Sequence, residues 1–115
     1  MNNNVNSDTL GCRLKLLGIV GWRLDDENCL IYVEDILSSR VVLPYGLKGL
    51  RGTGFSGLDL ESISFNKELE IFEISSLENC NKLREIKVYE HQLCLIKHLQ
   101  VLYPDIDVLI RKGVL

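Results

Sequence analysis

The sequence feature that most constrains the fold is an internal repeat of 22 to 23 residues. Residues 43–50 align with residues 65–72 at a spacing of 22. After one additional residue, residues 60–65 align with residues 83–88 at a spacing of 23. Apolar residues match apolar residues at nearly every step, and a period of this size is typical of repeat architectures. A repeat unit must stack on its neighbours to bury its apolar face, so the pattern favours a ribbed binding surface over a catalytic site.

The length and composition fit one ordinary domain. The 115 residues are 46% hydrophobic and 25% charged, as in globular proteins generally. The net charge of -3 argues against a nucleic-acid partner, which favours a basic face. The first residues lack the pattern of a signal peptide, and no apolar run approaches the roughly 18 residues of a membrane span. We therefore expect a soluble, cytoplasmic protein with no membrane partner.

Four cysteines are spread along the chain without a Cys-x-x-Cys pair. They are Cys12, Cys29, Cys80 and Cys94. A disulfide scaffold is usually shorter and denser in cysteine, and zinc sites usually have closely spaced ligand pairs. We expect free, mostly buried thiols that pack as small apolar side chains.

The N-terminal part predicts a polar tail followed by a hairpin. Residues 1–10 are rich in asparagine and predict a flexible tail, so the single domain is expected over residues 11–115. Apolar runs at residues 14–20 and 30–33 flank an acidic segment at 25–28. This layout predicts a β-hairpin with an acidic turn.

The remaining sequence predicts strands, irregular connections and one helix. Short repeat strands are expected at residues 41–43, 60–65 and 83–88, and a last strand at 106–110. Five glycines between residues 46 and 57 predict irregular turns or a short helix there. Leucine and isoleucine recur at helical spacing over residues 91–102 and leave Gln92 outside, which predicts an α-helix.

Two motifs with possible chemistry have simpler explanations. Residues 52–57 read G-x-G-x-x-G, but a dinucleotide site needs a preceding strand and a following long helix. A glycine-rich turn is the better interpretation. His91, Cys94 and His98 form a conceivable triplet of metal ligands on one helix face, but a buried thiol beside surface histidines is the simpler reading. We expect no metal or other cofactor and no enzymatic activity.

Several segments match a known repeat pattern of strand, proline turn, Phe-Ser-Gly-Cys segment and returning leucine. Residues 42–44 match the strand and proline, residues 55–58 the middle segment, and residues 60–63 the return. In the second unit Asn66 replaces the proline, and Cys80 lies at the position of the cysteine. The repeat thus resembles that of the BspA-type leucine-rich repeat family over about residues 41–88. The resemblance implies a solenoid fold and a role in protein binding.

In such a repeat, strand residues alternate between the core and the partner. The inward set is expected to be Val41, Leu43, Ile63, Phe65, Ile86 and Val88. The expected partner-binding set is Arg40, Val42, Ser62, Ser64, Asn66, Glu85, Lys87 and Tyr89, extended by Asp105, Asp107 and Leu109 if the last strand joins the same sheet. Arg40 and Tyr89 are the expected anchors, because arginine and tyrosine are enriched at binding hot spots.

The sequence therefore predicts an α/β fold, namely a short leucine-rich-repeat solenoid with an N-terminal β-hairpin and a C-terminal capping helix and strand. The predicted function is a small non-enzymatic protein-protein interaction module of the inhibitor or adaptor type. Two alternatives remain open. One is a metal-binding enzyme or sensor that uses His91, Cys94 and His98. The other is a self-associating subunit of a homo-oligomer.

Overall fold

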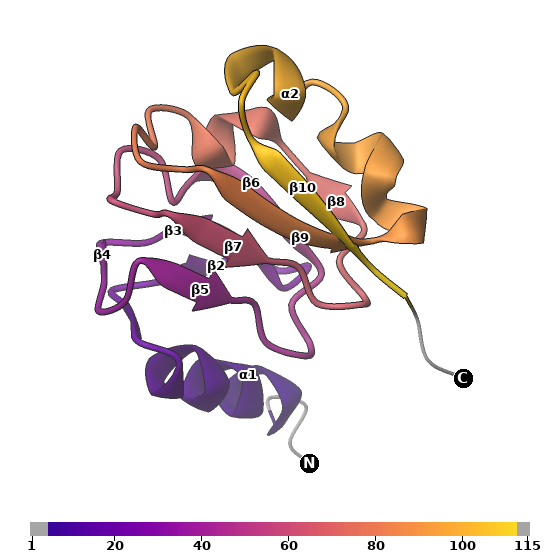
Figure 1. Cartoon of the computed structure of the whole chain (residues 1–115). Helices are drawn as coiled ribbons and strands as arrows, with labels where there is room; N and C mark the ends of the chain where they lie inside the picture. Colours follow the sequence, from indigo (N-terminus) through magenta and orange to yellow (C-terminus); the bar gives the residue numbers. More distant parts are fainter. Residues whose placement is uncertain (1–4, 113–115) are drawn as a thin grey trace.

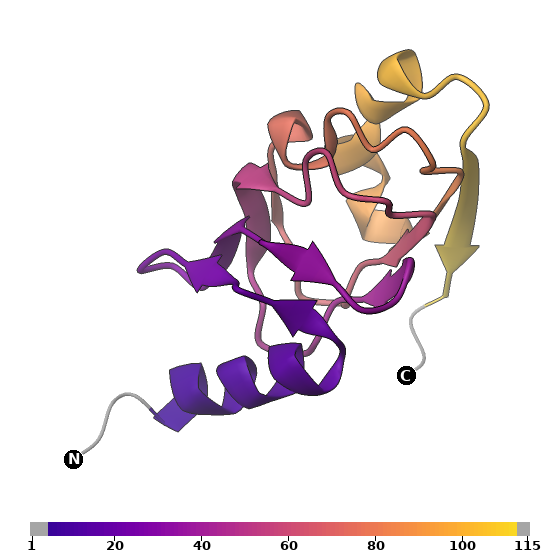
Figure 2. The same cartoon turned by 90° about the vertical axis from the view of Figure 1, so that its left-hand side faces the viewer.

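Two four-stranded β-sheets enclose the apolar core in the computed structural model of the chain (Figures 1 and 2). The structure describes residues 5–112, with side chains from residue 9 onward. The sheets lie on opposite sides of the core in Figure 2, and helical segments cover the two ends of the molecule. This arrangement leaves the outer surface of each sheet free of helices in these views.

The first sheet consists entirely of parallel strands. Its members are β5 (Arg40–Val42), β7 (Ser62–Ser64), β9 (Glu85–Tyr89) and β10 (Asp107–Arg111), in the spatial order β10-β9-β7-β5. Arg40 pairs with Ser62, Ser62 with Glu85, and Glu85 with Asp107, at sequence spacings of 22, 23 and 22. Equivalent positions of successive repeat segments therefore lie side by side across the sheet.

The second sheet is mixed. Its members are β2 (Arg23–Leu24), β3 (Cys29–Tyr32), β6 (Gly49–Gly54) and β8 (Ile71–Phe72), in the order β2-β3-β6-β8. β2 is antiparallel to β3, whereas β3, β6 and β8 are parallel. A separate two-stranded antiparallel pair joins β1 (Ile19–Val20) to β4 (Asp35–Ile36).

Alternation along the first sheet directs its apolar side chains inward. The predicted inward residues are all buried, at 2% exposure or less: Val41, Leu43, Ile63, Phe65, Ile86 and Val88. The ring of Phe65 contacts that of Phe72 from the second sheet, with centroids 5.7 Å apart. The prediction of the inward set is confirmed. It was possible because apolar residues at every second position of a strand point to the same face of the sheet.

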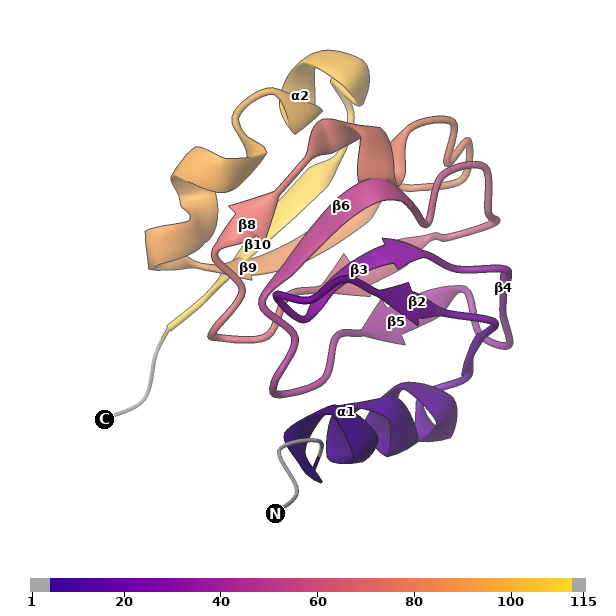
Figure 3. The same ribbon diagram turned by 180° about the vertical axis from the view of Figure 1, so that it is seen from behind.

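Helical segments close the ends of the core. Helix α1 (Val5–Leu16) lies below β5 and β2 in Figures 1 and 3, and buries Leu10 and Leu14. The 3₁₀-helix η1 (Ile74–Leu77) follows β8. The 3₁₀-helix η2 (Glu90–Ile96) and the short α2 (Leu99–Leu102) connect β9 to β10.

The predicted leucine-rich-repeat solenoid is wrong. That prediction placed repeat strands in one sheet joined by irregular segments, whereas the structure is a small α/β fold with one parallel and one mixed sheet. The connecting segments contain strands of their own: β6 pairs with β3 of a hairpin from the N-terminal part, and β8 pairs with β6. The hairpin is thus integrated into the second sheet instead of forming an added end unit.

The error arose from the reading of the glycine-rich segment, which forms β6. Gly49 lies in register between Cys29 of β3 and Ile71 of β8. A Cβ atom at Gly49 would come within 2.6 Å of the Ile71 carbonyl oxygen and 2.9 Å of the Cys29 sulfur. Glycine is present here because neighbouring strands approach too closely for any side chain, which is a known use of glycine in strands.

The N-terminal prediction also needs correction. Residues 1–10 were expected to be a flexible tail, but α1 begins at Val5, and residues 1–4 lie outside the described part. Leu10 and Leu14 are four residues apart, so they share one helix face and pack together on the core. The acidic turn at 25–28 and a second hairpin strand around residues 30–33 are confirmed. The predicted first strand at 14–20 is wrong, because residues 14–16 end α1, residues 19–20 form β1 and pair with β4, and the strand opposite β3 is β2.

The predicted helix over residues 91–102 is interrupted. η2 ends at Ile96, and α2 begins at Leu99. Gln92, expected outside, is completely buried. Its side-chain oxygen accepts a hydrogen bond from the Tyr89 N–H at 2.9 Å, which fixes the first turn of η2. The predicted last strand is confirmed as β10.

Two buried amides satisfy equivalent carbonyl groups in successive repeats. Asn66 Nδ2 donates to the carbonyl oxygens of Pro44 and Leu47, the latter at 2.9 Å. Gln92 Nε2 donates to the carbonyl oxygens of Asn66 and Leu69, at 2.7 and 3.0 Å. Pro44 and Leu47 precede Asn66 and Leu69 by 22 residues. Each amide thus closes the turn that follows a strand of the first sheet.

Loss of either amide should destabilise the fold strongly. In Asn66→Ala, the carbonyl groups of Pro44 and Leu47 lose the side-chain amide that donates to both, so the free energy of unfolding should fall by about 2–4 kcal/mol. Gln92→Ala should cost at least as much, because the Tyr89 N–H also loses its acceptor. Urea denaturation measures both values. The exposed neighbour Lys67→Ala serves as a control and should change stability by less than about 0.5 kcal/mol. An Asn66→Ala protein as stable as this control would contradict the assignment.

Candidate interaction surface

The outward-facing side chains of the first sheet form the candidate site, which we call the outer face. The register arranges them in rows across the four strands. One row runs Arg40, Ser62, Glu85, Asp107, and the next runs Val42, Ser64, Lys87, Leu109. A third, shorter row pairs Tyr89 with Arg111.

Five of the eight predicted site residues lie on the outer face with accessible side chains: Arg40, Val42, Glu85, Lys87 and Tyr89. Ser62 and Ser64 occupy the predicted rows, but are only 4% and 6% exposed between their longer neighbours. Asn66 was expected to face a partner and instead lies inside, where its amide binds Pro44 and Leu47. The alternation of inward and outward side chains ends at Phe65, where the chain turns. Asn66 lies inside because its amide donates to the carbonyl groups of the preceding turn.

Glu85 lies at the centre of a small charge cluster on the outer face. Its Oε1 atom is 3.5 Å from Arg40 Nη1 and 4.0 Å from Lys87 Nζ, and accepts a hydrogen bond from Ser62 Oγ at 2.9 Å. The Arg40 and Lys87 side chains are 59% and 39% exposed. Exposed ion pairs of this kind contribute little to stability. Because Arg40 and Lys87 are accessible and only weakly held by Glu85, both can also contact another molecule.

Tyr89 and Arg111 form a second cluster at the carboxyl end of the sheet. The Arg111 guanidinium carbon lies 5.1 Å from the centroid of the Tyr89 ring, which is the geometry of a cation-π contact. The His91 ring lies 6.1 Å from the same ring. Arg111 was missed at the sequence level, although its spacing of 22 from Tyr89 matches the repeat and could have revealed it.

Asp107 and Leu109 extend the outer face, as was expected if the last strand joined the sheet. Leu109 is 43% exposed and Val42, in the same row, is 50% exposed. The outer face therefore combines cations, carboxylates and two apolar side chains. Asp105 precedes β10 and is exposed.

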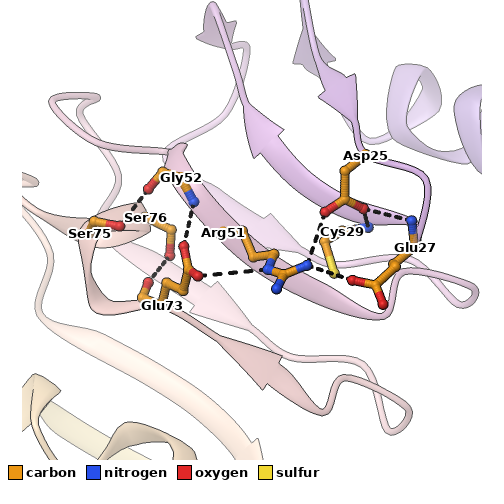
Figure 4. Close-up of polar contacts among 8 residues, drawn as sticks. All are labelled: Asp25, Glu27, Cys29, Arg51, Gly52, Glu73, Ser75 and Ser76. Carbon is orange, nitrogen blue, oxygen red and sulfur yellow. Dashed lines mark hydrogen bonds and ion pairs between the residues drawn. The ribbon is translucent and has the colours of Figure 1, made fainter.

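Arg51 organises a different polar cluster on the second sheet (Figure 4). Its Nη1 atom is 2.6 Å from Glu27 Oε1 and 3.3 Å from Asp25 Oδ2, and its Nε atom is 3.7 Å from Glu73 Oε2. The hydrogen bonds to Glu27 and Asp25 raise the pKa of Arg51 above its ordinary value. The guanidinium thereby connects the β2–β3 turn, β6 and the segment after β8.

The Asp25 and Glu73 carboxylates near Arg51 also accept hydrogen bonds from main-chain N–H groups. Glu73 Oε1 accepts from the Gly52 N–H at 2.9 Å, and Ser75 Oγ donates to the Gly52 carbonyl at 2.6 Å. Asp25 Oδ1 accepts from the Glu27 and Cys29 N–H groups, each at 2.9 Å. Because these groups fix turns and join strands, the cluster is structural. Arg51 precedes Glu73 by 22 residues, so this contact also follows the repeat.

Asp25 is the clearest electrostatic contributor in this cluster. Partial burial raises the pKa of its carboxyl group, but the Cys29 and Glu27 N–H groups and Arg51 outweigh this effect and lower the pKa overall. A group whose pKa is depressed by folding stabilises the folded state above its unfolded pKa of about 3.9. That stabilisation is lost as the pH falls through the folded pKa.

The alternative metal site is not formed. Within the described part of the chain, no group of three or more histidine, cysteine, aspartate or glutamate side chains is arranged to hold a metal ion. His91 Nε2 lies 3.0 Å from the Lys67 carbonyl oxygen, and the chain between Cys94 and His98 changes from η2 to α2. The expected alignment required one continuous α-helix.

All four cysteines are free thiols, but only two are buried. Cys29 and Cys80 lie in the interior, whereas Cys12 and Cys94 are exposed. Burial raises the pKa of both interior thiols. Cys80 Sγ donates to the Phe55 carbonyl at 3.2 Å, so it has a defined place in the core.

No family model, curated protein or solved structure matches this chain. The resemblance to BspA-type leucine-rich repeats therefore stays a prediction. Among residues 5–112 there is also no helix long and apolar enough to cross a membrane.

The Asp25 contacts predict a specific pH dependence. Asp25→Asn removes the charge that faces Arg51, so the free energy of unfolding at pH 7 should fall by about 1 kcal/mol. The difference from the unchanged protein should shrink as the pH is lowered below about 4, because Asp25 is protonated first in the unfolded chain and only at lower pH in the folded protein. Denaturant titrations at several pH values measure the difference.

Asp59→Asn is the matched control for this measurement. The Asp59 side chain is 81% exposed and lies 3.7 Å from Lys82. It should change stability by less than about 0.5 kcal/mol at pH 7. An Asp25→Asn protein with a constant stability difference between pH 7 and pH 3 would show that the charge on Asp25 is not responsible.

Proposed function

We propose that this chain is a small non-enzymatic protein-binding module of the inhibitor or adaptor type, and that it binds a protein partner through the outer face. The observation that carries the proposal is the register of the first sheet. It brings Arg40, Val42, Lys87, Tyr89 and Arg111 from three separate strands onto one exposed surface.

The chemistry of this surface suits a protein partner. Arginine and tyrosine are among the residue types enriched at binding hot spots. The Arg111–Tyr89 contact holds both side chains in a defined position, which lowers the conformational entropy lost on binding. Val42 and Leu109 add apolar area between the charged rows.

The small side chains on β7 give the outer face its shape. Ser62 and Ser64 are short and lie between longer side chains of β5 and β9. Above Ser62, Arg40 of β5 and Glu85 of β9 approach each other, with Arg40 Nη1 3.5 Å from Glu85 Oε1, so charged side chains cover the central strand. The accessible surface offered to a partner is therefore made by the longer side chains of β5, β9 and β10.

The proposal is tested by affinity purification from an extract of the source cells, followed by mass spectrometry. An Arg40→Ala/Lys87→Ala/Tyr89→Ala variant should lose the partner that the unchanged chain recovers. Where the partner is purified, the dissociation constant should rise at least 30-fold, because hot-spot changes cost about 2 kcal/mol or more.

A matched control changes the same three residue types elsewhere. Arg23, Tyr32 and Lys97 are exposed and lie off the outer face. Their triple alanine variant should bind the partner as well as the unchanged chain does. A triple outer-face variant that folds normally and retains full binding would contradict the proposal.

A further inference from the structure

Within residues 5–112, the first sheet has one long edge strand that no other strand covers. β10 has five residues and ends the strand order β10-β9-β7-β5. The other terminal strands of the two four-stranded sheets are shorter, with three residues in β5 and two each in β2 and β8. Figure 2 shows β10 at the margin of the molecule.

The free edge of β10 carries backbone groups that can pair with another strand. The Asp107 N–H donates to the Arg84 carbonyl at 2.8 Å, so Asp107 bonds toward β9. Backbone groups alternate sides along a strand, so those of Leu109 and Arg111 also point toward β9, and those of Val108 and Ile110 point away from it. Unpaired groups on an exposed apolar edge are a template for strand addition.

The side chains of β10 are complementary to a second copy of the same strand. We propose that two copies of this chain form a symmetric dimer by antiparallel pairing of β10 with β10 of the second copy, centred on Leu109. In this register Asp107 lies opposite Arg111 of the second copy, and Arg111 lies opposite its Asp107. Val108 lies opposite Ile110, and the two Leu109 side chains meet at the two-fold axis.

This register is selected by three independent features of the strand. It pairs all five residues of β10, whereas a shift in either direction leaves residues unpaired. It makes Val108 and Ile110, the residues with outward-pointing backbone groups, into hydrogen-bonded pairs. It also places opposite charges across both ends, and opposite-charge pairs stabilise antiparallel strands whereas like charges destabilise them.

The dimer would also cover apolar surface that the single chain exposes. Ile110 and Leu109 are 52% and 43% exposed, on opposite faces of the strand. Antiparallel partners direct paired residues to the same side of the sheet, so each of these side chains would gain an apolar neighbour. The two outer faces would then lie on the same side of one continuous eight-stranded sheet.

Exchange of the charges at Asp107 and Arg111 tests this dimer and distinguishes loss of dimerisation from loss of folding. The unchanged protein should be dimeric by analytical ultracentrifugation. Asp107→Arg and Arg111→Asp should each weaken dimerisation about tenfold or more, because each places like charges across both ends. The double variant Asp107→Arg/Arg111→Asp should recover the dimer, and a mixture of the two single variants should form a heterodimer.

Several results would overturn the proposal. These are a monomer at concentrations up to about 1 mM, a dimer indifferent to both single changes, or a double variant that stays monomeric while its circular dichroism matches the unchanged chain. The Arg40/Lys87/Tyr89 variant retains Asp107 and Arg111, so it should still dimerise. Failure of the partner-binding proposal and failure of this one are therefore distinguishable.

A cross-link tests the register directly. In a Cys12→Ser/Cys94→Ser background, which removes the two exposed thiols, Leu109→Cys should form an intermolecular disulfide under mild oxidation. Its Cα atoms would lie about 4.5 Å apart across a non-hydrogen-bonded pair, within the range for a disulfide. Val42→Cys, equally accessible but distant from β10, should stay uncross-linked. Equal cross-linking of both variants would overturn the register.

Discussion

The structure depends on lateral pairing of short parallel strands that are 22 or 23 residues apart in the sequence. A strand of three residues, such as β5 or β7, has too few hydrogen bonds and too little apolar surface to be stable alone. Stacking places Val41, Ile63 and Ile86 in one buried row, so that each strand is buried by its neighbours. The same spacing controls contacts outside the strands, because Asn66 and Gln92 close equivalent turns and Arg51 contacts Glu73.

Side chains with local hydrogen-bonding tasks determine where the regular pattern stops. Asn66 occupies the position of Pro44 in the following repeat segment, and its amide satisfies carbonyl groups of the previous turn. Gln92 satisfies carbonyl groups of the following turn, and its side-chain oxygen accepts a hydrogen bond from the Tyr89 N–H at the start of η2. A polar residue at the end of an apolar strand can thus be an interior hydrogen-bond donor. This explains why Asn66 does not belong to the outer face.

The parts of the fold that follow from alternation could be predicted from the sequence, and those that follow from close packing could not. The buried positions of β5, β7 and β9 were predictable because apolar residues alternate with polar ones. The second sheet was missed because Gly49 and Gly54 suggest irregular structure, whereas the reason for glycine is the proximity of Ile71 and Ser76. Helix α1 was missed because its first residues are polar; among its side chains described from residue 9 onward, Leu10 and Leu14 pack on the core.

The candidate site was likewise predictable only in part. Arg40, Lys87 and Tyr89 could be placed on one face by counting along each strand, because the repeat sets their register. The burial of Ser62 and Ser64 could not be foreseen, because it depends on the lengths of side chains on adjacent strands. The spacing of 22 also relates β10 to β9, but the repeat was recognised only over about residues 41–88, so the parallel register of β10 became clear only from the structure.

The outer face and the edge of β10 share residues, and this has a physical consequence for binding. Leu109 and Arg111 belong to both, so occupation of the edge would fix the side chains that border the outer face. Two outer faces on one side of a continuous sheet would present the Arg40, Lys87 and Tyr89 clusters twice, related by a two-fold axis. A partner with two equivalent sites would then bind with an effective concentration set by the rigid sheet, and its apparent affinity would exceed that of either face alone.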